Sequence, residues 1–142
     1  MLKLDVLNNS GLKANMMIID YKTGNLRNIQ KIIESMNEVA TIGNSVDEIN
    51  NASSYILPGV GAFDDAMSTI IDLGIIEALR YNVLIKKKPI LGICLGMQLL
   101  GARSDEGEPI SGLCFLDMAV KKIKVSDGLR LPHIGWNNLH VR

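Results

Sequence analysis

The chain has 142 residues, of which 47% are hydrophobic and 21% charged, and its 15 basic and 15 acidic residues give a formal net charge of zero. This length predicts one domain with its own core, and the apolar fraction excludes a disordered chain. The balanced charge argues against a nucleic-acid binder, which needs clustered excess Lys and Arg, and no apolar run approaches the ~18 residues of a membrane-spanning helix.

Apolar runs alternate with amphipathic segments after a poorly patterned stretch at residues 1–15. Short apolar runs bounded by Gly, Pro or Asp predict buried strands, and apolar residues spaced by three or four predict helices. The capping-box pair Ser45 and Glu48 opens a further short helix. The predicted strands lie at residues 16–19, 39–42, 55–57, 89–93, 113–116, 119–125 and 139–141, and the other predicted helices at 24–36, 63–71, 75–85 and 94–100.

This alternation predicts an α/β fold, with a mostly parallel sheet and helices on both of its faces. We divide the chain into an extension at residues 1–15 and one domain at residues 16–142. Parallel sheets carry their chemistry in the loops that follow the carboxyl ends of their strands. Three loops are therefore of interest, and they follow Asp20, Leu57 and Ile93.

The loop after Ile93 carries the sharpest functional signal. Gly92-Ile-Cys94-Leu-Gly96 fits the G-x-nucleophile-x-G elbow, with Cys where hydrolases often have Ser. Such an elbow presents its central residue at a helix N-terminus, where free N–H groups favour a thiolate. The N–H of Leu95 can then face a developing oxyanion. The alternative is a buried Cys in a tight turn, but the predicted strand before it and helix after it favour a nucleophile.

The 58–61 loop, Pro58-Gly-Val-Gly61, follows the preceding strand of the predicted sheet. Its two glycines allow backbone N–H groups to turn toward an anion, and it fails as a dinucleotide fingerprint because Asp64 stands at the sixth position. It fits a second oxyanion donor beside Cys94, although an ordinary strand-to-helix turn would have the same composition.

The remaining chemistry-bearing residues give weaker signals. Cys114 has no elbow around it and is interpreted as an inert core thiol. Cys94 and Cys114 are spaced for neither a zinc site nor a disulfide framework, so we expect no metal, no cofactor and a reducing, cytoplasmic setting. A thiol nucleophile normally needs a base, usually His. Neither His133 nor His140 has a carboxylate at a spacing that suggests an orienting partner.

Four segments together resemble the class I glutamine amidotransferases. The elbow continues to Gln98, the 58–61 loop continues to Ala62 and Phe63, and the other two segments read Asp-Tyr-Lys-Thr-Gly-Asn at 20–25 and Pro-His-Ile-Gly-Trp-Asn at 132–137. The elbow is shared across the family. The full combination is narrower and is most similar to the glutaminase subunits of imidazole glycerol phosphate synthases, which serve histidine biosynthesis.

The resemblance implies a role for each matching residue. Cys94 would attack the side-chain amide of glutamine, with the N–H groups of Val60 and Leu95 holding the oxyanion. Gly61 and Gln98 would position the substrate. Ammonia would pass to a (β/α)₈-barrel cyclase in a heterodimer. The residues expected to face that partner are Asn25, His133, Trp136 and Asn137.

The resemblance also exposes one departure. Members of the family carry a catalytic His and Glu in a His-x-Glu segment near the C-terminus, which neither His133 nor His140 matches. We therefore expect the chain to be a C-terminally truncated, inactive form whose sheet is incomplete. Two alternatives remain: an ammonia-supplying subunit for a surface-sugar amidotransferase, or a catalytically silent docking subunit.

Overall fold

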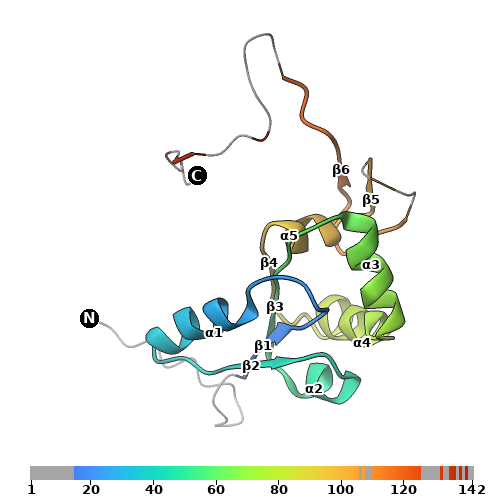
Figure 1. The fold of residues 1–142 in the computed structure, drawn as a ribbon. Coiled ribbons are helices and arrows are strands. Elements are labelled where there is room, and N and C mark those ends of the chain that lie inside the picture. Colours follow the sequence, from blue (N-terminus) through green and yellow to red (C-terminus); the bar gives the residue numbers. More distant parts are fainter. Residues whose placement is uncertain are drawn as a thin grey trace.

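The computed structural model describes residues 15–105, 107, 110–125, 132, 135, 136, 138 and 140. Its centre is a four-stranded parallel sheet in the order β2-β1-β3-β4 (Figure 1). The strands are β1 (Met16–Ile19), β2 (Ala40–Gly43), β3 (Ser54–Leu57) and β4 (Ile90–Gly92). This order is flavodoxin-like, and a switch point of the topology lies between β1 and β3. The predicted α/β class is confirmed.

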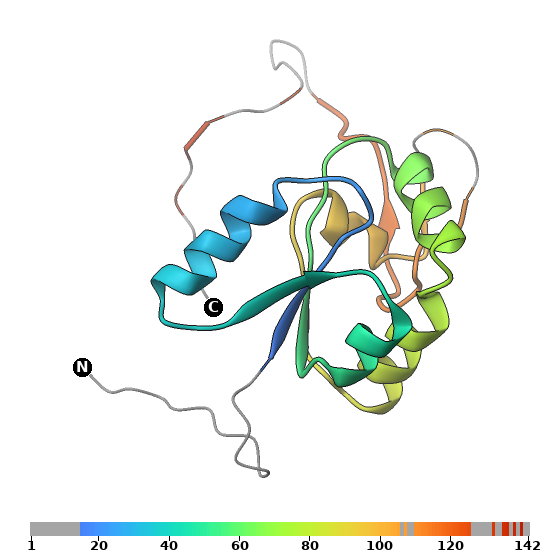
Figure 2. The ribbon, with the colours of Figure 1, turned by 60° about the horizontal axis from the view of Figure 1, so that its bottom comes forward.

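Helices cover both faces of this sheet because its strands are apolar on both sides. On one face, Ile18 and Ile56 pack with Ile33 of α1 (Leu26–Ser35). The other face carries Ile19 and Leu57 and belongs to the larger core cluster. Figure 2 shows α1 lying on its own, apart from the remaining helices. These are α2 (Val46–Asn51), α3 (Phe63–Asp72), α4 (Ile76–Arg80), the π-helix η1 (Tyr81–Ile85) and α5 (Leu95–Leu99).

Local signals set several of these boundaries as expected. The capping box is present, because the Ser45 hydroxyl accepts from the Glu48 N–H and the Glu48 carboxylate accepts from the Ser45 N–H. The predicted 75–85 helix changes at Tyr81 to π geometry, in which the Lys86 N–H donates to the Tyr81 carbonyl. Buried Asn82 donates there to the Asn50 side chain and thereby joins η1 to α2.

The expected strand at residues 113–116 is wrong. This run instead closes the end of α5, since the N–H groups of Leu113, Cys114 and Phe115 donate to the carbonyls of Leu99, Gly101 and Leu100. Carbonyls at a helix C-terminus lack hydrogen-bond partners within the helix. Because the N–H groups of this apolar run bond to those carbonyls, they are not available to pair with a strand. Leu113 is fully buried in this arrangement.

A small second sheet lies beyond α5. The expected strand at residues 119–125 is shortened to β6 (Ala119–Val120), because its partner β5 (Arg103–Ser104) has only two residues. β5 was not predicted from the sequence. The expected strand at residues 139–141 lies outside the described residues. Over the part of the chain that the structure describes, none of the helices has the length and apolar character to cross a membrane.

Candidate active site

The backbone at Cys94 has the geometry of a strand-to-helix elbow. Cys94 caps α5 with φ 55° and ψ −115°, a region that L-residues rarely adopt. The turn is held on its strand side, where the Ile93 N–H donates to the Leu57 carbonyl at 2.9 Å. On its helix side, the Met97 N–H donates to the Cys94 carbonyl at 3.0 Å. The elbow therefore presents an exposed thiol at the carboxyl edge of the sheet.

The two glycines of the elbow are required by close backbone contacts. A Cβ on Gly96 would lie 1.7 Å from the Leu57 carbonyl oxygen, and a Cβ on Gly92 would lie 2.5 Å from the Met97 Cα. Real Cβ atoms do not approach backbone this closely. The pattern predicted from the sequence thus has a steric reason: only glycine lets α5 begin against the ends of β3 and β4.

The 58–61 loop lies directly beside this elbow. A Cβ on Gly59 would be 3.2 Å from the Leu95 Cβ. Within the described part of the chain, the backbone N–H groups of Val60 and Leu95 make no hydrogen bond. Gly61 has φ 112°, so its conformation favours glycine although its surroundings are open. Two adjacent loops thus offer free N–H donors near one thiol.

Tyr21 is a site residue that the sequence reasoning missed. Its side chain is fully buried, and its hydroxyl donates to the Pro58 carbonyl at 2.5 Å. Burial raises the pKa of the Tyr21 phenol; the Thr23 hydroxyl opposes the rise and the Cys94 thiol adds to it. Tyr21 therefore lies within electrostatic reach of the nucleophile. The available signal was its place in the loop after β1, one of the three loops at the functional edge.

The remaining predicted substrate and interface residues occupy separate positions. Gln98 is half-buried on α5, one turn beyond Cys94. Asn25 caps α1 through its side chain, which accepts from the Asn28 N–H. It also lines a pocket of about 330 Å³ with Asp20, Gly24, Leu26, Arg27 and Ile42. The pocket is near the 58–61 loop, because a Cβ on Gly24 would lie 3.5 Å from the Gly59 Cα.

The C-terminal candidates are only partly described. His133 and Asn137 lie outside the described residues. The Trp136 indole is fully exposed, with a relative exposure of 103%, so it is not a core residue in this structure. His140 is also exposed. The described residues thus place no histidine beside Cys94.

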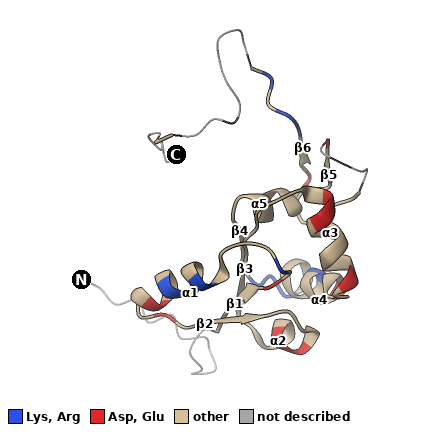
Figure 3. Ribbon diagram, viewed as in Figure 1, with Lys and Arg blue, Asp and Glu red and all other residues tan. Residues whose placement is uncertain are grey.

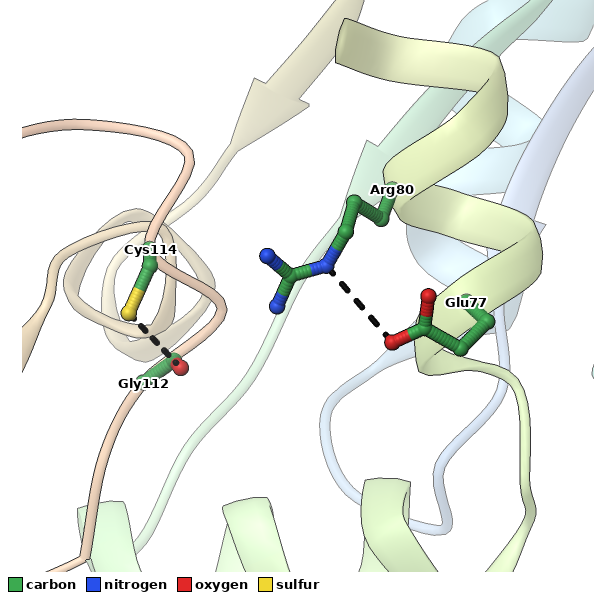
Figure 4. A network of polar contacts seen from close by, with 4 residues as sticks. All are labelled: Glu77, Arg80, Gly112 and Cys114. Atoms are coloured by element: carbon green, nitrogen blue, oxygen red, sulfur yellow. Dashed lines mark hydrogen bonds and ion pairs between the residues drawn. The ribbon is translucent and has the colours of Figure 1, made fainter.

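Cys114 corrects one expectation, because it is exposed and not a core thiol. Its backbone takes a positive φ of 56°, which turns the side chain outward while Leu113 next to it is buried. The Cys114 Sγ lies 3.5 Å from the Gly112 carbonyl oxygen, as Figure 4 shows. The same view contains the surface ion pair between Arg80 and Glu77 at 3.7 Å.

The charged side chains near the elbow belong to its neighbours and not to α5. α5 carries none, whereas α2 and α3 begin with acidic residues, including Asp64 and Asp65 (Figure 3). No group of three or more His, Cys, Asp or Glu residues is arranged to hold a metal ion among the residues that are described. The described residues of the elbow and the 58–61 loop supply a thiol and backbone donors.

Comparison with known proteins agrees with this geometry. Residues 17–139 match the family Glutamine amidotransferase class-I. The imidazole glycerol phosphate synthase subunit HisH 1 of Campylobacter jejuni is 44% identical over 87% of this chain and 62% of its own length. Subunit HisH 2 of Pseudomonas aeruginosa is 40% identical over 87% of this chain and 60% of its own length. The chain thus spans about three-fifths of the length of these curated relatives.

A solved structure supports the fold independently. A glutamine amidotransferase crystal structure superposes with a TM-score of 0.55 at 15% identity, covering 63% of this chain and 47% of that one. At this identity the likeness concerns the fold alone. Because the family match extends over most of the sequence and includes the cysteine elbow, this chain belongs to the class I glutamine amidotransferase family.

Proposed function

We propose that this chain carries the nucleophile of a glutaminase that hydrolyses glutamine to glutamate and ammonia, as a subunit of an imidazole glycerol phosphate synthase in cytoplasmic histidine biosynthesis. The observation that carries the proposal is the exposed Cys94 thiol on a positive-φ elbow, next to Val60 and Leu95 N–H groups that make no hydrogen bond with the described residues. The relatives named as synthase subunits support the choice among class I amidotransferases.

The reaction follows from the residues of the elbow. The Cys94 Sγ attacks the carboxamide carbon of glutamine, and the oxyanion accepts hydrogen bonds from the Val60 and Leu95 N–H groups. The C–N bond breaks as the thiol proton passes to the departing nitrogen, so that ammonia leaves and a glutamyl thioester remains. Water then attacks the thioester, releasing glutamate and restoring the thiol. Gly61 and Gln98 are proposed to position the substrate.

Proton transfer is the step that the described residues support least, because they place no histidine beside Cys94. We expect a polypeptide of residues 1–142 to show negligible glutamine turnover, because a positioned general acid or base typically contributes about 10²–10⁴-fold. Glutamate release measured with and without a barrel cyclase tests this expectation. Robust turnover that is lost in His133→Ala would show that His133 is the base.

Substrate recognition can be tested without turnover. Cys94 and Cys114 are both exposed, so Cys114 serves as an internal reference for alkylation by iodoacetamide. We expect L-glutamine to slow alkylation of Cys94 but not of Cys114, measured by peptide mass spectrometry at limiting reagent. D-Glutamine and L-asparagine should not protect. Equal protection of both thiols, or of neither, would count against a glutamine site at the elbow.

We further propose that the ammonia passes to a (β/α)₈-barrel cyclase in a heterodimer, with Asn25, His133, Trp136 and Asn137 facing it. The exposed positions of Asn25 and Trp136 support this proposal. Binding of this chain to the cyclase, measured by titration, tests the proposal. A parallel titration with the partner of a sugar-modifying amidotransferase tests the competing candidate. Binding to the cyclase without any glutamine protection of Cys94 would favour a silent docking subunit instead.

A further inference from the structure

Tyr21 occupies an unusual position for a residue of a surface loop. It directly follows Asp20 at the end of β1, yet it is fully buried beneath the neighbouring 58–61 loop. Its hydroxyl donates to the Pro58 carbonyl, which has no other hydrogen bond among the described residues. Pro58 is itself buried, so this carbonyl would be costly to leave without a partner.

The Tyr21 ring also sets which residue can follow Pro58. A Cβ on Gly59 would lie 1.8 Å from the Tyr21 hydroxyl oxygen and 3.1 Å from the ring carbon that bears it. The Leu95 Cβ of the elbow would lie 3.2 Å from the same added Cβ, and a Cβ on Gly24 would lie 3.5 Å from the Gly59 Cα. Gly59 is therefore enclosed by the loop after β1 and the start of α5.

These contacts remove most of the freedom of the peptide that leads to Val60. The proline ring fixes φ at residue 58, and a planar trans peptide makes the Gly59 N–H point opposite to the Pro58 carbonyl. Anchoring that carbonyl therefore orients the whole peptide unit. Only the dihedral angles of Gly59 then remain to aim the Val60 N–H, and the enclosure of Gly59 limits those as well.

We propose that Tyr21 is a positioning residue that holds the 58–61 loop so that the Val60 N–H meets the substrate oxyanion. This inference rests on the glutaminase function proposed above. Tyr21 acts through the loop and does not touch the substrate, because its side chain is buried. The proximity of Cys94, which adds to the raised pKa of the Tyr21 phenol after burial, agrees with a loop anchored next to the nucleophile.

The test compares Tyr21→Phe with the matched control Tyr55→Phe. Tyr55 is equally buried and donates to a backbone carbonyl at 2.7 Å, but that carbonyl belongs to Ile49 of α2 and not to the 58–61 loop. Each variant therefore loses one buried tyrosine–carbonyl hydrogen bond. The first readout is hydrogen exchange at the buried amide of Gly59, because the amides of Val60 and Gly61 are exposed and make no hydrogen bond with the described residues. We expect this exchange to become roughly three- to tenfold faster in Tyr21→Phe only.

The second readout concerns oxyanion stabilisation at Cys94. Acylation by an activated γ-ester of L-glutamate passes through an oxyanion, whereas alkylation by iodoacetamide does not. The ratio of the two rates should fall roughly three- to tenfold in Tyr21→Phe and stay constant in Tyr55→Phe. A structural defect alone would change both rates or neither.

The outcomes separate this inference from the proposed function. If Tyr21→Phe matches Tyr55→Phe in exchange and in the rate ratio, Tyr21 does not position the loop. Faster exchange with an unchanged rate ratio would also overturn the proposal, since the loop would then not govern the oxyanion. If wild-type Cys94 is not acylated at all, the glutaminase proposal is wrong, and the exchange comparison alone decides whether Tyr21 holds the loop.

Discussion

The elbow shows how single residues determine the candidate site. Cys94 takes a positive φ that its two flanking glycines make possible, because they remove the Cβ atoms that would meet Leu57 and Met97. The strain at Cys94 is thus held by backbone contacts on both sides. The same reasoning identifies Gly96 as the described glycine least able to accept a side chain, because its added Cβ would meet a backbone oxygen at 1.7 Å.

Gly96→Ala should therefore destabilise the protein by about 3 kcal/mol, the upper part of the usual range for forcing extra atoms into packed structure. The added Cβ would meet backbone, which cannot move aside as a flexible side chain could. Gly135→Ala is the control, because no described atom lies within 4 Å of the Cβ that it would add, and it should be neutral. Urea melts measure both. Similar midpoints for the two variants would contradict the elbow packing.

At the scale of elements, the capping box of α2 links stability to pH. Glu48 accepts from Ser45 and Asn44, and these hydrogen bonds, that of the Ser45 hydroxyl first, lower the pKa of its carboxyl in the folded state. A carboxyl with a lowered folded pKa contributes stability above its unfolded pKa, and that contribution is lost as pH falls through the folded value.

Glu48→Gln should consequently be less stable than the wild type at pH 7, and the difference should shrink as pH falls below about 4. Denaturant melts across this pH range measure the difference. Asp47→Asn is the control, since it changes one carboxyl in the same first turn without removing the capping box. A wild-type advantage over Glu48→Gln that persists undiminished at acidic pH would refute this account of the cap.

Much of the element order could be predicted from the sequence because local signals and tertiary packing agree in its first hundred residues. The strand at Met16–Ile19 and the box at Ser45 and Glu48 are examples. The 113–116 run could not be predicted, because its apolar pattern suits a strand while its N–H groups are taken by carbonyls at the end of α5. Tyr21 was missed for a similar reason: its burial depends on a loop 37 residues away.

At the scale of the whole molecule, the two faces of the sheet are covered unequally. Leu91 pairs in register with Ile56 and so lies on the α1 face, yet it is 56% exposed whereas Ile56 is 7% exposed. β4 is also at an edge of the described four-stranded sheet. Exposed apolar surface next to a strand edge promotes association.

Leu91→Lys should therefore raise the monomer fraction of a polypeptide of residues 1–142 without lowering its stability by more than about 0.5 kcal/mol, as for an ordinary surface change. Ile85→Lys is the control, because Ile85 is 68% exposed at the end of η1, away from this face. Sedimentation velocity at several concentrations measures the effect. An equal response to both substitutions would show that the β4 face does not govern association.

The proposed partner surface has one aromatic residue that is fully exposed, Trp136. Aromatic anchors at interfaces often cost 2 kcal/mol or more when truncated, which corresponds to a loss of roughly 30-fold in affinity. Trp136→Ala should weaken binding to the cyclase by about this factor and leave the melting temperature unchanged. A lowered melting temperature with unaltered affinity would instead assign the indole to the fold.

The central claim is that Cys94 is the nucleophile for the side-chain carbonyl carbon of glutamine. Trapping the acyl-enzyme tests it most directly, because an activated γ-ester of L-glutamate has a leaving group that departs with little need for a general acid. After acid quenching and peptide mapping, we predict a glutamyl adduct on the Cys94 peptide, none on the Cys114 peptide, and none in Cys94→Ala. Absence of the adduct, or equal acylation of Cys94 and Cys114, would contradict the claim.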